Sequence, residues 1–186
     1  SGTFVAARIP ARVNDARKTR IAVEAPQQGA LALGCIERAR RQADLLAEQG
    51  VEHLRLVVLD STRPGEVRGE LDAGRLSWLD AELAGAPDHP TLIALHHPPV
   101  STGIAAWDEL GLPVADRRAL GDVLWRHPQV RRVVAGHVHR TMTAELAGRA
   151  VIAVPSTYVQ MRLSFNADEI EIAAEPPGFA VHALVN

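Results

Sequence analysis

Cysteine, aromatic residues and long apolar runs are all scarce in this chain of 186 residues. Cys35 is its single cysteine, so a disulfide framework is excluded and a reducing cytoplasm is the expected compartment. No apolar run reaches the roughly 20 residues that a helix needs to cross a bilayer, and Ser1–Ala7 does not read as a signal peptide. These absences predict a cytoplasmic protein that has no membrane partner.

The chain also lacks a strong excess of charge of either sign. A formal net charge of -2 gives no reason to expect a nucleic-acid polymer as a partner. The charge is unevenly spread, however. Residues 1–50 contain eight basic and five acidic side chains, whereas residues 51–186 contain twelve and seventeen. We therefore separate an atypical basic, alanine-rich segment with one helix (1–50) from a second part (51–186).

Apolar residues make up 47% of the chain, which suits a globular domain with a core of its own. Apolar spacings of three and four predict helices, and short apolar runs predict strands. Alternation of the two as far as residue 135 predicts an α/β sheet with helical crossovers, and the later strands predict an antiparallel region. The expected helices span 30–49, 71–84 and 115–125, and the expected strands span 21–23, 54–59, 91–95, 130–135, 150–154, 158–165, 169–173 and 179–184.

Two of the expected strands end directly in histidine. Strand 91–95 runs into His96 and His97, which two prolines follow, and strand 130–135 runs into Gly136-His137-Val138-His139. Sites in α/β proteins lie at the carboxyl ends of strands, and imidazole is a good ligand for divalent transition metals. On an extended backbone, His137 and His139 would point to the same side. The pattern predicts a metal site built from His96, His137 and His139.

Several residues around this predicted site keep two interpretations. A His-x-His pair binds nothing in most proteins, and it is the combination with the second histidine motif that favours a metal. His97 is predicted to be catalytic, by orienting a substrate or protonating a leaving group, or else it packs around the ligands. Asp60, at the end of a strand, is either a fourth metal ligand or a turn residue. Trp107 is either a core anchor or a contact for a nucleobase.

The two histidine motifs, in this order, resemble the last two signature blocks of the calcineurin-like metallophosphoesterases. The branch they most resemble is that of the bacterial cyclic-nucleotide and glycerophosphodiester phosphodiesterases. The resemblance covers residues 51–186. Further segments that fit this branch are Leu59–Thr62, Gly69–Leu71, Leu76–Leu79, Pro155–Thr157 and Pro176–Phe179.

The resemblance implies a function and a division of ligands. His96 and His137 would bind one metal of a two-metal site, and His139 would bind the other. Family sites hold iron, manganese or zinc, so one or two such ions are expected. Paired metals clamp a phosphate and activate water as the nucleophile. The implied activity is metal-dependent hydrolysis of cyclic nucleotides, such as cAMP, or of small phosphodiesters.

The departure from the family lies in residues 1–50. The family opens with Asp-x-His, Gly-Asp and Gly-Asn-His-Asp motifs, and none of these is present there. The chain thus resembles a truncated α/β sandwich, about the carboxy-terminal half of a family member, completed by dimerisation. Leu33, Ile36 and Leu46 are candidate dimer contacts, or else they belong to a helix that packs on the chain's own core. The alternative function is an inactive remnant that acts as a metal-binding or dimeric interaction module.

Overall fold

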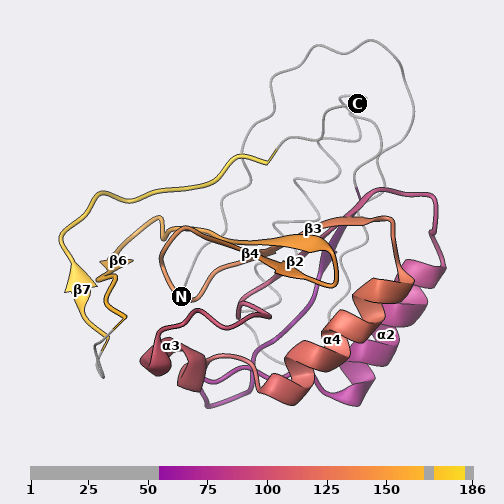
Figure 1. The fold of residues 1–186 in the computed structure, drawn as a ribbon, viewed down its shortest axis with the longest axis horizontal. Coiled ribbons are helices and arrows are strands. Elements are labelled where there is room, and N and C mark those ends of the chain that lie inside the picture. Colours follow the sequence, from indigo (N-terminus) through magenta and orange to yellow (C-terminus); the bar gives the residue numbers. More distant parts are fainter. Residues whose placement is uncertain (1–54, 166–169, 183–186) are drawn as a thin grey trace, which may run out of the picture.

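The computed structural model describes residues 55–165 and 170–182 (Figure 1). The predicted strand 21–23, the predicted helix 30–49 and the candidate dimer contacts Leu33, Ile36 and Leu46 all lie outside these residues. In chain order the described elements are β1 (Arg55–Val58), α2 (Ala73–Ala84), β2 (Thr91–Leu95), α3 (Ala105–Leu110), α4 (Val114–Arg126), β3 (Val130–Ala135), β4 (Met142–Leu146), β5 (Arg149–Ala153), β6 (Gln160–Met161) and β7 (Ile172–Ala173).

The main sheet has five strands in the order β1-β2-β3-β5-β4. Its first four strands are parallel neighbours, and β4 pairs antiparallel with β5 at the edge. Parallel neighbours require crossover connections. Helix α2 makes the crossover between β1 and β2, while α3 and α4 lie in the connection between β2 and β3. The predicted α/β class is confirmed.

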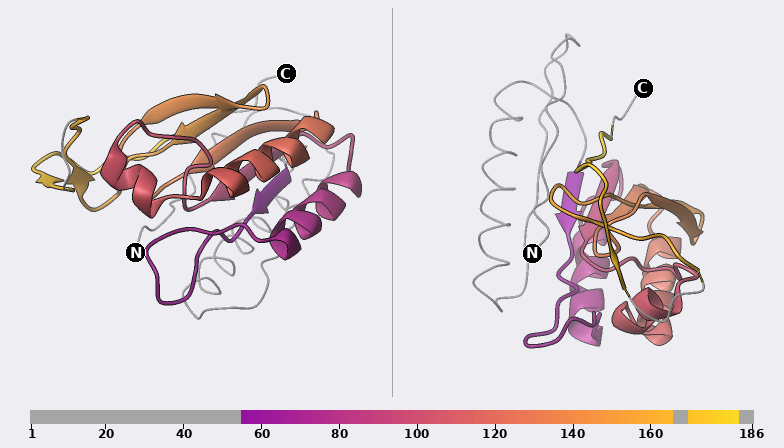
Figure 2. Two further views of the ribbon diagram at one scale, coloured as in Figure 1. Left: turned by 60° about the horizontal axis from the view of Figure 1, so that its bottom comes forward. Right: turned by 90° about the vertical axis from the view of Figure 1, so that its left-hand side faces the viewer.

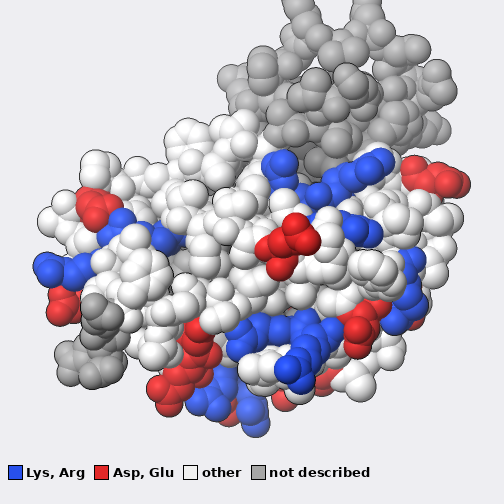
Figure 3. Space-filling view, viewed as in Figure 1, with Lys and Arg blue, Asp and Glu red and all other residues white. Residues whose placement is uncertain are grey.

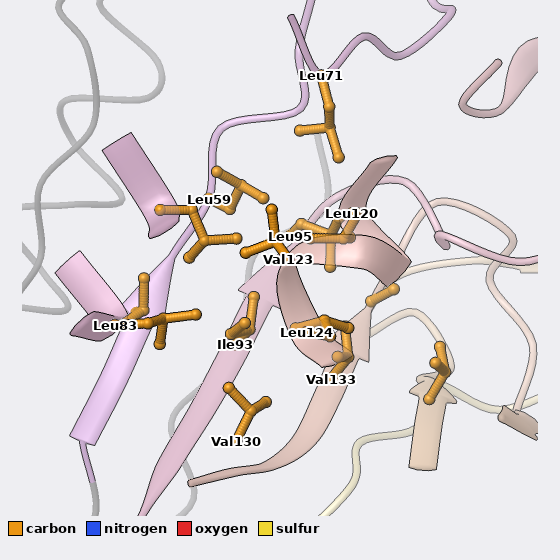
Figure 4. Packing of buried hydrophobic residues seen from close by; sticks show 14 of the residues in the cluster. Leu59, Leu71, Leu83, Ile93, Leu95, Leu120, Val123, Leu124, Val130 and Val133 are labelled. Atoms are coloured by element: carbon orange, nitrogen blue, oxygen red, sulfur yellow. The ribbon is translucent and has the colours of Figure 1, made fainter. Parts of the chain in front are cut away.

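A row of β-branched side chains crosses the four parallel strands at one level. Val57 pairs with Ile93, Ile93 with Val133, and Val133 with Val151, and all four are fully buried. This row faces α2 and α4, which cover the same side of the sheet (Figures 1 and 2). Leucines of these helices and of the nearby loops complete the core (Figure 4): Leu59, Leu71, Leu79, Leu83, Leu112, Leu120 and Leu124.

The ends of α2 follow from its sequence. Asp72 is its N-cap, and the carboxylate accepts a hydrogen bond of 2.8 Å from the backbone N–H of Arg75. Gly85 closes the other end. The cap explains why the helix begins two residues later than its apolar pattern predicts. Helix α4 agrees with its prediction to within one residue at each end.

After residue 135 the structure departs from the prediction. Strand β5 joins the main sheet beside β3, and the separate antiparallel region is only the two-stranded ribbon of β6 and β7. Strand β4 was not predicted. It turns into β5 through Ala147 and Gly148, both with positive φ (50° and 73°), as a two-residue hairpin turn requires. Alanine there gives little sequence signal of such a turn.

Three other differences concern short elements. Helix α3 has six residues, too few to show helical periodicity, and was not predicted. The strand predicted at 158–165 forms only at Gln160–Met161. The one predicted at 179–184 does not form over its described residues, 179–182. Within the described residues, no helix is both long enough and apolar enough to span a membrane.

We expect the core between α4 and the sheet to dominate stability. Replacing fully buried Leu124 with alanine should lower the free energy of unfolding by about 2–5 kcal/mol, because it leaves a cavity. The neighbouring Trp125, 74% exposed, provides the control, and its change to alanine should stay within about 0.5 kcal/mol. Urea denaturation of both variants checks this, and equal losses would contradict the described packing.

Candidate metal centre

Three histidine side chains gather at the carboxyl edge of the sheet. One ring nitrogen from each of His96, His97 and His137 lies within 4.8 Å of the others. The sheet register explains the meeting, because Leu95 at the end of β2 pairs with Ala135 at the end of β3. The pairing continues beyond the strands, where the N–H of Gly136 donates to the carbonyl of His96 at 2.9 Å. The next residue, His137, therefore lies close to His96.

The geometry of His96 and His137 suits a shared ion. Nε2 of His96 lies 3.1 Å from Nδ1 of His137. Two metal–nitrogen bonds of about 2.0–2.1 Å to one ion would place their nitrogens roughly 3 Å apart. Nε2 of His137 is buried and has no hydrogen-bond partner among the described residues. His96 Nε2 and His137 Nδ1 are therefore the pair of donors that fits one divalent ion, and Nε2 is the other nitrogen of the His137 ring, whose burial without a partner is unfavourable.

Burial keeps these imidazoles neutral. Burial, together with a smaller effect of the neighbouring His97, lowers the pKa of His96 to about 4 and that of His137 to about 3. Burial also lowers the pKa of His97. All three pKa values lie below the ordinary value of 6.5, so the rings are uncharged at pH 7. Neutral imidazole is the form that binds metal.

The backbone of the second histidine motif is not extended, which corrects the sequence prediction. His137 and His139 have φ values of 68° and 52°, in the left-handed region that disfavours residues other than glycine. Between them, Val138 is buried with Ile104 and Trp107 in a small apolar cluster. Two residues in this region are unfavourable by about 1–3 kcal/mol each, and such outliers concentrate at functional sites.

The structure does not bring His139 into the cluster of His96, His97 and His137. Its Nδ1 instead donates to the carbonyl of Val159 at 2.8 Å, which leaves Nε2 with the lone pair. The hydroxyl of Ser156 accepts from the N–H of Tyr158 and of Val159 and so fixes this turn. A carbonyl partner of this kind commonly orients a histidine that binds metal. The assignment of His139 to a second ion stays a prediction.

Asp60 is engaged in a turn. Its carboxylate accepts from the backbone N–H of Thr62 at 2.8 Å and from the Thr62 hydroxyl at 2.7 Å. This is the turn role that the sequence left open beside the metal role. Asp60 is not part of the histidine cluster. Its negative charge acts to raise the pKa of His97, against the larger lowering effect of burial. Its role as a ligand stays a prediction.

Trp107 packs against the site from α3. Its ring meets that of His137 edge-on, with centroids 5.1 Å apart, and only 7% of the residue is exposed. This ring is therefore a packing element and is not open to a nucleobase. The neighbouring Asp108 accepts from the N–H of Thr102 at 2.7 Å and so ties the loop after Pro99 to the helix.

Sequence reasoning missed two partners of His97. The hydroxyl of Ser61 lies 2.9 Å from its Nδ1, and the carbonyl of Val67 lies 2.9 Å from its Nε2. Ser61 stands in the Leu59–Thr62 segment that the family resemblance had singled out. Its place in that segment was the one feature of the sequence that could have marked Ser61 as a site residue. The carbonyl of Val67 carries no signal in the sequence, because any residue supplies one.

Comparisons with known proteins agree with this site. No family model matches the chain. The "Probable glycerophosphodiester phosphodiesterase" of Arcobacter nitrofigilis is 35% identical over 130 residues, which cover 69% of this chain and 47% of that protein. The 3',5'-cyclic adenosine monophosphate phosphodiesterase of Escherichia coli is 37% identical over 60% of this chain and 40% of its own length. The chain is a homologue of bacterial phosphodiesterases. The predicted branch is thereby confirmed.

The relationship covers only part of these relatives. The chain spans less than half the length of the curated relatives that it matches. Among solved structures, a dimetal phosphatase from Danio rerio is 28% identical and has a TM-score of 0.40, covering 47% of this chain and 28% of that one.

We expect Trp107 to stabilise the loop of His137. Trp107→Ala should lower the free energy of unfolding by about 3–5 kcal/mol, because it removes a buried aromatic ring. Trp107→Phe keeps an aromatic edge against the imidazole and should lose clearly less. Urea denaturation measures both. Equal losses for the two variants would show that the ring contact has no specific value.

Proposed function

We propose that this chain is a metal-dependent phosphodiesterase that hydrolyses cyclic nucleotides, such as cAMP, or small phosphodiesters. The observation that carries the proposal is the approach of His96 Nε2 to His137 Nδ1, at 3.1 Å, at the ends of two adjacent parallel strands. The homology to bacterial phosphodiesterases supplies the reaction class. Because the chain covers less than half of those proteins, the activity is a proposal for this chain.

His96 and His137 would hold one ion, and His139 and Asp60 are the proposed ligands of a second. A bound divalent ion polarises a phosphoryl oxygen and makes a bound water more acidic. Iron, zinc and manganese are the candidate metals. The contribution of the chain is to present neutral imidazoles in a fixed place, since Trp107 and the carbonyl of Val159 hold the rings of His137 and His139.

The predicted catalytic role of His97 has a structural requirement. Both of its ring nitrogens are occupied, by Ser61 and Val67. To orient a phosphate or protonate a leaving group, the ring would have to break one of these hydrogen bonds. A direct role for His97 therefore predicts movement of the loop that carries Ser61 and Val67.

Hydrolysis of bis(4-nitrophenyl) phosphate tests the proposed activity. Chelation should abolish turnover, and Zn²⁺ or Mn²⁺ should restore it. His96→Ala and His137→Ala should each lower kcat/KM by more than about 100-fold. Loss of a residue that only hydrogen-bonds to a metal ligand costs up to about 100-fold, and loss of the ligand itself should cost more. The exposed His89 provides the control, and His89→Ala should leave turnover unchanged. Failure of the folded protein to turn over with any divalent metal would refute the proposal.

A second candidate function is a metal-binding module without turnover. The observation that favours it is the composition of the cluster, which within the described residues contains three histidines and no carboxylate. Calorimetry with Zn²⁺ separates the two functions. Binding that His137→Ala abolishes, in a sample with no hydrolysis, would establish the module in place of the enzyme.

We also propose that the chain forms a homodimer. In the described part, β1 has a single neighbour in the sheet, and an open strand edge invites pairing. The carboxy-terminal arm exposes several large apolar side chains, namely Tyr158, Leu163, Phe165, Ile172, Phe179 and Val181. Light scattering at micromolar concentration should give twice the mass of the chain, and a monomer would refute the proposal.

The proposed substrate is small, and no nucleic-acid polymer is proposed as a partner. Basic and acidic side chains are interspersed over the face in Figure 3, where neither sign forms a continuous patch. A polyanion is bound by a surface of one sign. The cytoplasmic location inferred from the single cysteine stays a prediction.

A further inference from the structure

The loop between β1 and α2 closes around His97. Its two ends meet where the N–H of Glu70 donates to the carbonyl of Ser61 at 3.1 Å. Inside this loop, Ser61 is 1% exposed and His97 2% exposed, so their contacts are shielded from water. Hydrogen bonds in such a place are expensive to leave unmade.

The hydrogen bonds fix which ring nitrogen of His97 carries the proton. The carbonyl of Val67 can only accept, so Nε2 must be the donor in their contact of 2.9 Å. In the neutral ring, Nδ1 is then an acceptor. The hydroxyl of Ser61 donates to Nδ1 at 2.9 Å and accepts from the backbone N–H of His97 at 3.1 Å. Each polar atom in this arrangement therefore has a partner.

Gly69 supplies the third contact of the loop. A Cβ atom at this position would lie 2.6 Å from both Cγ and Nδ1 of His97, closer than any packed carbon can approach. The ring thus lies directly on the backbone of Gly69. On its other sides it meets the ring of His96, at 4.7 Å between centroids, and that of His137, at 4.5 Å.

We propose that His97 is a positioning residue, fixed in its Nε2-protonated form by Ser61 and Val67, which holds His96 and His137 together and is not itself a metal ligand. The inference rests on the proposed function only in taking His96 and His137 as ligands. Geometry alone would group all three histidines. The hydrogen bonds divide them, because Ser61 and Val67 engage both ring nitrogens of His97, whereas the contact of His96 Nε2 with His137 Nδ1 joins the two proposed ligand atoms themselves.

Nitrogen NMR of the imidazole rings tests the proposal directly. Long-range proton–nitrogen correlation of the full chain, with His97 assigned from its absence in His97→Gln or by through-bond connection, should show Nε2 protonated and Nδ1 not. Ser61→Ala should give a mixture of the two neutral forms, and Ser61→Thr, which keeps a hydroxyl, should restore the single form. A wild-type ring protonated at Nδ1 would overturn the proposal.

Metal titration provides a second measurement. On addition of Zn²⁺, the ring nitrogens of His96 and His137 should take the shifts of bound imidazole, and those of His97 should not. His97→Gln keeps an N–H donor for Val67 but no imidazole nitrogen. Its Zn²⁺ affinity by calorimetry should fall by less than about 100-fold, which is the range for a residue that supports a metal ligand without binding the metal. The Zn²⁺ affinity of His96→Gln should fall by more. A loss as large for His97→Gln as for His96→Gln would overturn the proposal.

These measurements separate this inference from the proposed activity. The protonation state of His97 is read without any turnover, so a protein that hydrolyses nothing would refute the phosphodiesterase proposal and leave the NMR result to decide the role of His97. Gly69→Ala adds an independent check, because the new methyl group would displace the ring. It should broaden or shift the His97 signals, while Gly85→Ala, which meets only ordinary contacts, should not.

Discussion

The parallel register of β2 with β3 is the constraint on which the site depends. It sets Leu95 beside Ala135, so His96 leaves the sheet opposite Gly136 and close to the next residue, His137. A shift by one residue would turn every side chain of the strand to the other face of the sheet. The same pairing buries Ile93 against Val133 in the row that faces α2 and α4. Core packing and site geometry are thus set by the same hydrogen bonds.

The stability that the buried core provides has to offset two unfavourable features at the edge of the sheet. The left-handed backbone of His137 and His139 and the desolvation of the imidazoles both disfavour this arrangement. Val138 offsets part of this, because its position between the two histidines places it in the apolar cluster with Trp107. The carbonyl of Val159 and the loop around His97 then restrict the rings. The strain is located where a ligand would be bound, as in other preorganised sites.

Sequence reasoning predicted the parts of this structure that depend on local pattern. The apolar runs gave β1, β2, β3 and β5, and helical spacing gave α2 and α4, because burial on one face leaves a periodic trace. The meeting of His96 with His137 followed from strand ends that lie on one edge. Hairpin β4–β5 was not predicted, because Ala147 in its turn has a positive φ, which alanine seldom adopts. The partners of His97 were missed because a backbone carbonyl and a glycine contact are set by tertiary structure.

The donor atoms of the described cluster bear on the choice of metal. Imidazole nitrogen suits zinc and iron, whereas manganese and magnesium prefer carboxylate and carbonyl oxygen. His96 and His137 offer nitrogen alone, and the cluster that contains them has no carboxylate among the described residues. Neutral ligands also leave the full charge of a divalent ion in place, which strengthens its effect on a bound water. The described residues therefore favour zinc or iron, and a manganese site would need oxygen ligands that this cluster does not supply.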